Sequence, residues 1–223
     1  MASQSDIDAA VAQILALIDA EDFAVLANGT ADLLGRVSEA SGHDALLTLG
    51  FKEDSDASLF DVVNEHVVAT AKKRGAELVG MKYDEDGKLI PNPNPKWATS
   101  DGTRELLRGT VQDAVEEGWS AKQLADAVEQ HYAFSESRAE MIGRTEIARA
   151  QGQGNLAAWK NSGVVSKKSW LLGSEHDDDD ECDDNSDAGQ IAIDDEFPSG
   201  DDAEPAHPRC VCVTVAHVED ESE

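Results

Sequence analysis

Three cysteines and one histidine gather toward the C-terminal end of the chain, and their side chains are the ones best suited to chemistry. Cys210 and Cys212 are two residues apart, His207 comes shortly before them, and Cys182 lies further upstream. Thiolate and imidazole are ligands that zinc prefers, and a closed zinc site needs four of them. On a regular strand, Cys210 and Cys212 would share one side. Cys182, His207, Cys210 and Cys212 are therefore the candidate metal site, with zinc as the expected cofactor.

Two other interpretations of these cysteines stay open. Their local spacing differs from the usual Cys-x-x-Cys knuckle, so they could be free thiols packed around a β core beside a partly buried histidine. Cys182 could also form a disulfide, although an odd number of cysteines without a secretory signal argues against a disulfide framework. Zinc ligation, free thiols and a disulfide of Cys182 are the three alternatives.

The acidic residues around Cys182 carry a weaker cation signal. Asp183, Asn185 and Asp187 alternate as in a calcium-binding loop, and Asp194 follows at the twelfth position. The glycine of that pattern, Gly189, comes one place late, and Asp194 is shorter than the bidentate Glu that calcium loops use. Calcium is therefore expected less than zinc. The segment is predicted to be a solvated acidic loop, and the four-Asp run at 177–180 a repulsive surface.

Charge limits the partners that the chain can have. The 223 residues include 46 Asp and Glu against 18 Lys and Arg, for a net charge of -28. The stretch from Ser174 to Glu204 holds 15 of these acids and no Lys or Arg. Direct, specific nucleic-acid binding is not expected, because counterion release requires clustered Lys and Arg. No apolar run is long enough for a membrane span, and MASQSDIDAA lacks the features of a signal peptide, so the chain is expected in a reducing cytoplasm.

The elements that must position these residues are mostly helices. Apolar residues at helical spacing predict a helical core, with helices at about 5–18, 30–40, 58–78, 101–118, 120–130 and 135–154. Ser41-Gly42 is expected to break the second helix, and Gly118 to end the fourth. Gly152 and Gly154 would either allow close approach of another helix or weaken their own helix.

Non-helical segments follow from proline and from β-branched residues. Residues 83–98 contain PNPNP and are predicted to be extended, or a short hairpin with its turn at Asp86-Gly87. VVSKKSWLL and VCVTVAHV are predicted strands. The fold class is α+β, mainly α. A helical body spans residues 1–160, a small β-containing module spans 161–218 with an acidic loop at about 174–206, and an acidic tail spans 219–223.

Several motifs in this order resemble phage Mu F-like head-morphogenesis proteins, the minor head proteins of phages. The resemblance covers roughly residues 60–215 and is carried by the order and spacing of the motifs together. They are KRGAELVGM, NPNPKWATSDGTRELLR, Arg144-Thr145-Glu146, Lys168-Ser169-Trp170, Cys182 and Pro205–Cys212. This chain has Asn185 where many relatives have a second loop cysteine, and Val211 where relatives often have arginine.

The resemblance implies a low-copy structural component of the virion head, acting in procapsid morphogenesis at or near the portal, or in DNA packaging or ejection. It further implies that portal or major capsid protein is the partner, and that the chain is found in the host cytoplasm during assembly. The alternative function is a small metal-dependent hydrolase that uses the Cys/His cluster or the acidic loop. Because the sequence has no phosphate-binding glycine loop, His-Glu-x-x-His motif or nucleophile elbow, no catalytic residue is predicted and the chain is expected not to be an enzyme.

Overall fold

The computed structural model describes residues 20–96, 98, 113, 117, 123, 127, 136–177 and 180–218. These residues form an α+β fold that is mainly helical, which confirms the predicted fold class. The chain divides into two compact units. The first contains residues 1–31 and 72–140, and the second contains residues 32–71 and 141–223. Within the described residues, no helix is long and apolar enough to cross a membrane.

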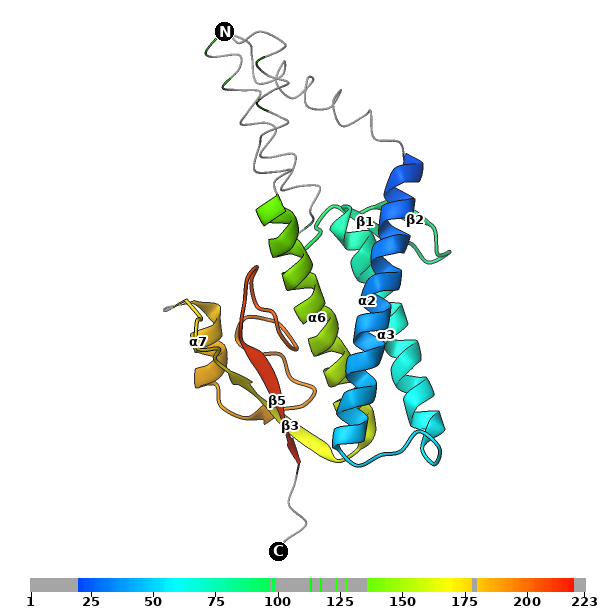
Figure 1. Ribbon diagram of the computed structural model, residues 1–223, viewed down its shortest axis with the longest axis vertical. Coiled ribbons are helices and arrows are strands. Elements are labelled where there is room, and N and C mark those ends of the chain that lie inside the picture. Colours follow the sequence, from blue (N-terminus) through cyan, green and yellow to red (C-terminus); the bar gives the residue numbers. More distant parts are fainter. Residues whose placement is uncertain are drawn as a thin grey trace, which may run out of the picture. The chain divides into compact units, whose positions relative to one another are not determined.

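Three long helices dominate the described part of the chain (Figure 1): α2 (Ala20–Thr48), α3 (Ala57–Leu78) and α6 (Glu136–Ser162). The predicted helices at 58–78 and 135–154 are thereby confirmed. The helix expected at 5–18 lies outside the described residues. So do those at 101–118 and 120–130, except for positions 113, 117, 123 and 127, which are helical.

The break predicted at Ser41-Gly42 is wrong, because α2 continues to Thr48. Gly42 is buried, and a Cβ added there would lie 2.7 Å from a Val63 methyl carbon and 3.1 Å from the carbonyl oxygen of Gly154. Glycine costs about 1 kcal/mol inside a helix. Beyond it, Ala45 and Leu46 are buried in the core of the second unit, and that packing outweighs the cost.

In the first unit, α3 is followed by a hairpin of β1 (Met81–Tyr83) and β2 (Leu89–Pro91). Gly87 has a positive φ of 75°, and the Asp84 carboxylate accepts hydrogen bonds from the backbone of Asp86 and Lys88. This confirms the hairpin with a turn at Asp86-Gly87. The proline-rich segment after it is held by α3, because Arg74 donates to the carbonyl oxygen of Lys96 at 2.6 Å.

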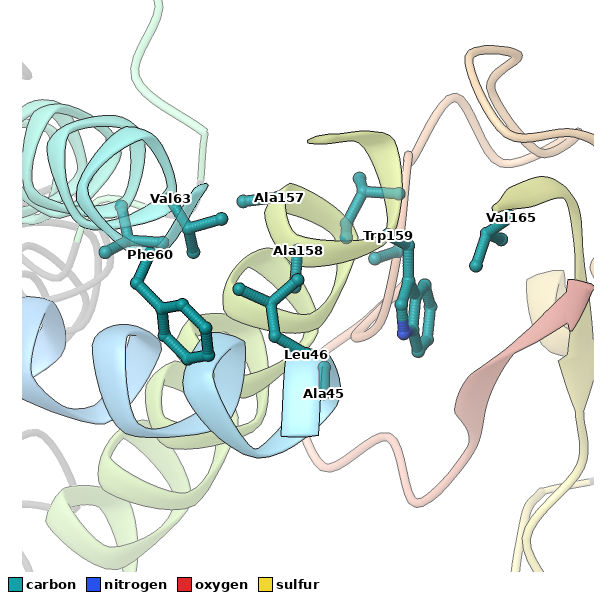
Figure 2. Packing of buried hydrophobic residues seen from close by; sticks show 11 residues of the cluster. Ala45, Leu46, Phe60, Val63, Ala157, Ala158, Trp159 and Val165 are labelled. Atoms are coloured by element: carbon teal, nitrogen blue, oxygen red, sulfur yellow. The ribbon is translucent and has the colours of Figure 1, made fainter. Parts of the chain in front are cut away.

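The core of the second unit lies where the three helices meet β3 (Val165–Leu171). Figure 2 shows side chains from α2, α3 and α6 converging there: Phe60 and Val63 lie on one side of Ala158, Leu46 lies next to it, and Trp159 and Val165 lie on the other side. Gly154 allows α6 to approach α2, because an added Cβ would lie 2.9 Å from the carbonyl carbon of Ser38. The helix is continuous through Gly152 and Gly154, so close approach is their role.

The second unit also contains a three-stranded antiparallel sheet in the order β4-β3-β5, formed by Ile191–Ala192, Val165–Leu171 and Val213–Val218. Figure 1 shows β3 and β5 side by side, in the register Trp170↔Thr214. Both predicted strands are confirmed, but β5 begins at Val213. Cys210 and Cys212 therefore lie in the segment that enters the strand, and the prediction that they share one side of a regular strand is wrong.

A second hydrophobic cluster lies against this sheet. Trp170 of β3 meets Phe197 edge to face, with ring centroids 5.0 Å apart. The other buried members are Cys182, Ala206 and Cys212, and Cys210 packs against them. Three cysteines thus share the small core on which the C-terminal segment folds.

Candidate metal centre

Cys182 is positioned by a short helix that forms inside the acidic stretch, α7 (Glu181–Asp187). Asp180 caps its N-terminus: one carboxylate oxygen accepts a hydrogen bond from the Cys182 amide at 2.7 Å, and Asp183 accepts one from the Asp180 amide. Acidic side chains in a first turn also interact favourably with the helix dipole. Sequence reasoning predicted a solvated loop here, and it treated Asp180 as part of a repulsive run.

The inner face of α7 carries Cys182 and Asn185, three residues apart and both fully buried. Asn185 accepts a hydrogen bond from the Ser199 amide at 2.9 Å and donates one to the Ser199 hydroxyl at 3.0 Å. It therefore ties the loop before Asp201 to α7. Because Asp183, Asn185 and Asp187 lie on a helix, they do not form the loop that the calcium pattern requires.

The segment before β5 supplies the other candidate ligands. A turn joins His207 to Cys210, whose amide donates to the His207 carbonyl oxygen at 3.2 Å. Arg209 within this turn has a φ of 67°, which is uncommon for a residue with a side chain. Its amide donates to the hydroxyl of Thr145 on α6 at 3.2 Å. That bond fixes the turn and brings His207 and Cys210 to the same side of the small core.

Cys182 lies at the centre of the four residues that the sequence singled out. Its sulfur is 3.5 Å from Sγ of Cys210 and 3.3 Å from Nε2 of His207. The sulfurs of Cys182, Cys210 and Cys212 all lie within 4.8 Å of one another. None of these three cysteines forms a disulfide. Burial raises the pKa of the Cys182 thiol well above its usual range, and the neighbouring Cys210 raises it further. Burial likewise raises the pKa of Cys210.

Asp180 is a member of the cluster that sequence reasoning missed. Its Oδ2 atom lies 3.0 Å from Nε2 of His207, and its carboxylate belongs with Cys182 and His207 to a second group of close ligand atoms. That oxygen is buried and has no hydrogen-bond partner among the described residues. The available signal was its position two residues before Cys182, where an Asp can cap a helix that begins at the next residue.

The outer side of the cluster opens to solvent through an acidic depression. His207 lies in its wall, together with carboxylates from the run before α7 and from α7 itself: Asp177, Asp180, Glu181, Asp183, Asp184 and Asp187. His176 adds a third group of potential ligand atoms, with Asp180 and Asp183. Clustered negative charge raises the local concentration of cations.

Two buried ionisable residues lie in the same unit but outside the cluster. The Lys168 side chain is fully buried; its Nζ donates to the Asp202 carbonyl oxygen at 2.8 Å and lies 5.3 Å from the centre of the Phe197 ring. Burial lowers the pKa of Lys168 and raises that of Glu204, which accepts a hydrogen bond from the Thr214 amide at 2.9 Å. Sequence reasoning assigned neither residue a role.

Comparison with known proteins adds one match. Residues 105–215 match the family model described as "Phage Mu protein F like protein". The matched region contains β3, α7, β4, the first half of β5 and the whole Cys/His cluster. No curated protein and no solved structure matches the chain.

Proposed function

Because this chain belongs to the phage Mu protein F-like family, we propose that it is a minor structural protein of a phage head that acts in procapsid morphogenesis at or near the portal. The observation that carries the proposal is the family match. Since the resemblance noted in the sequence and the match cover the same C-terminal motifs, both support a place in the head. The proposal includes attachment to the portal and a later part in DNA packaging or ejection.

The charge of the chain supports a protein partner rather than DNA. At a net charge of -28, phosphate contacts would be repulsive, whereas capsid and portal proteins can offer complementary surfaces. We therefore expect the full chain to leave naked DNA unshifted at physiological salt. Tight DNA binding by the isolated chain would contradict the proposed mode of action.

Portal attachment can be tested by assembling procapsids with and without portal protein. The full chain would be co-expressed with the major capsid protein and scaffold of its own phage, and sedimented shells would be probed for it. We expect the chain in shells that contain portal and not in shells that lack it. Equal amounts in both kinds of shell would refute attachment at the portal. Absence from both would refute the head assignment.

A structural role also predicts that the cluster is not catalytic. A catalytic zinc keeps one coordination position open for water or substrate, whereas a structural zinc is closed by four protein ligands. The described cluster offers three sulfurs and one imidazole nitrogen around Cys182. If His207 approached Cys210 and Cys212, with which it shares no group of close ligand atoms, these four residues would close the site and favour the structural role over the hydrolase alternative.

A further inference from the structure

We propose that Cys182, His207, Cys210 and Cys212 bind one structural zinc ion, with Asp180 as the carboxylate beside the histidine ligand. The proposal goes beyond a role in the phage head and does not depend on it. It selects one of the alternatives that the sequence leaves open, on the arrangement of the three sulfurs, His207 and the groups around them.

The Nε2 atom of His207 faces two electron-rich groups. A carbonyl oxygen only accepts, so the 2.9 Å contact between Nδ1 and the Pro208 carbonyl oxygen places a proton on Nδ1. In the neutral ring, Nε2 then presents a lone pair. It faces the Asp180 carboxylate at 3.0 Å and the Cys182 sulfur at 3.3 Å. A metal ion bound here would place positive charge between these three atoms.

The Cys182–Cys210 and Cys182–His207 distances are close to those between two ligands of one zinc ion. Two sulfurs on one tetrahedral zinc lie about 3.8 Å apart, and a sulfur and an imidazole nitrogen about 3.5 Å, given the usual bond lengths. The sulfurs of Cys182 and Cys210 are 3.5 Å apart, and Cys182 and His207 3.3 Å. A zinc ion would need these two pairs to move apart by only a few tenths of an ångström, and it would need His207 to approach Cys210 and Cys212, with which it shares no group of ligand atoms within 4.8 Å. Each thiol would release its proton to solvent on binding.

The groups that surround the proposed ligands are also of the kind found around a bound metal. Metal-bound histidines donate their other ring N–H to an acceptor, as His207 does to Pro208. The Gly173 amide points at the Cys212 sulfur from 3.5 Å, the kind of hydrogen bond that stabilises a bound thiolate. Gly173 reaches this position because it has no Cβ: an added one would lie 2.9 Å from the Val211 carbonyl carbon. The acidic depression beside His207 provides the entry path for a cation.

The primary test measures metal in the full chain, produced in zinc-supplemented medium and purified without chelators. We expect about one zinc per chain. Replacement by cobalt should give the thiolate-to-metal charge-transfer band and the ligand-field bands of a tetrahedral site. A wild-type chain that contains only traces of zinc, takes up no cobalt in this form and keeps three titratable thiols would overturn the proposal. So would a mass that shows a disulfide at Cys182.

Variants define the ligand set. Cys182→Ser and Cys212→Ser should each lose the bound zinc, with circular dichroism used to confirm that the helices persist. His176→Gln is the matched control: it removes a nearby histidine that belongs to the other ligand group, and it should retain full zinc content. Zinc retained by Cys182→Ser, or lost from His176→Gln, would refute the site. If a variant fails to fold, the cobalt spectrum of the wild type still decides.

Asp180→Asn tests whether Asp180 is itself a zinc ligand or only a neighbour of the ligand His207. Asparagine caps helices as well as aspartate does, so α7 should persist while the charge beside His207 is lost. We expect zinc affinity to fall about 10–100-fold, measured by competition with a chelating dye, while the purified variant still holds zinc. Complete loss of zinc in Asp180→Asn together with retention in Cys212→Ser would give the fourth position to Asp180 and overturn the proposed set.

Discussion

The substitution Gly154→Ala tests the packing of α6 against α2, on which the core of the second unit depends. Ordinary carbon–carbon contacts lie at about 3.5–4.0 Å. A Cβ at residue 154 would lie 2.9 Å from the carbonyl carbon of Ser38 and 3.0 Å from its Cα. The obstacle is helix backbone, so relief requires the two helices to separate by roughly 0.5–1 Å. That movement would also stretch the buried 2.6 Å hydrogen bond from the Ser38 hydroxyl to the Ala150 carbonyl oxygen.

Overpacking of this kind costs about 1–3 kcal/mol. Alanine gains about 0.5–1 kcal/mol over glycine inside a helix, which offsets part of that cost. Gly143 lies in the same helix, and an added Cβ there meets nothing within 4 Å. Gly143→Ala should therefore show the helix gain alone. Because the helix gain is common to both variants, they should differ in unfolding free energy by the overpacking cost of about 1–3 kcal/mol, with Gly154→Ala the less stable.

Urea denaturation followed by circular dichroism measures both variants, and the comparison is valid where the slope against denaturant stays constant. A Gly154→Ala protein as stable as the wild type would show that α2 and α6 do not approach at Ser38. A Gly143→Ala protein destabilised to the same extent would show that alanine disturbs α6 for some other reason.

Three further substitutions test buried polar groups of the second unit by the same assay. Lys168→Ala should destabilise the fold by about 2–5 kcal/mol, because it empties a fully buried volume and leaves the Asp202 carbonyl oxygen without its hydrogen bond. Lys167→Ala, at an exposed neighbouring position, should change stability by less than about 0.5 kcal/mol, and equal effects of the two substitutions would refute this packing. Asn185→Ala should lower stability by about 1–3 kcal/mol, because it leaves the Ser199 amide without a hydrogen-bond acceptor. Asp187→Ala, at an exposed position of the same helix, should be nearly neutral; a neutral Asn185→Ala would show that Asn185 does not hold the Ser199 loop to α7. Burial raises the pKa of Glu204 above its ordinary value of 4.5, so the folded state keeps the carboxyl proton to higher pH than the unfolded state does, and stability should fall as the pH rises above 4.5. Glu204→Gln should remove this part of the pH dependence of stability. An unchanged pH profile in that variant would exclude Glu204 as its source.

The parts of the fold that could be predicted from sequence are those in which apolar spacing sets the outcome. The stripe of α3 buries Phe60, Val63, Val67 and Ala71 at helical spacing, and β5 was indicated by its β-branched composition. The break expected at Gly42 was wrong because local propensity is worth about 1 kcal/mol there, and contacts with Val63 and α6 decide the matter. Those contacts come from residues distant in sequence, which no local window contains.

The acidic stretch escaped prediction for the opposite reason. Helix α7 has only seven residues and almost no apolar side chains, so it shows no periodicity. Its formation depends on the capping of Asp180 and on two inward residues, Cys182 and Asn185, whose partners lie in later segments. The spacing of Cys182, His207, Cys210 and Cys212 nevertheless pointed to the residues that the fold brings together, because thiols and imidazole are scarce in this chain.

Bringing these groups together also has an energetic consequence. Cys182 and His207 are separated by 25 positions, and closing a flexible loop of that length costs about 3 kcal/mol. The segment between them contributes Phe197, Ala203 and Ala206 to hydrophobic cores, while its acids repel one another. Packing of the Trp170–Phe197 pair adds about 0.5–1.5 kcal/mol beyond the area that it buries. A zinc ion held at both ends of the segment would offset the closure cost several times over and would neutralise charge where repulsion is greatest. The metal would therefore stabilise the fold of the C-terminal segment, which is what a zinc site closed by protein ligands does.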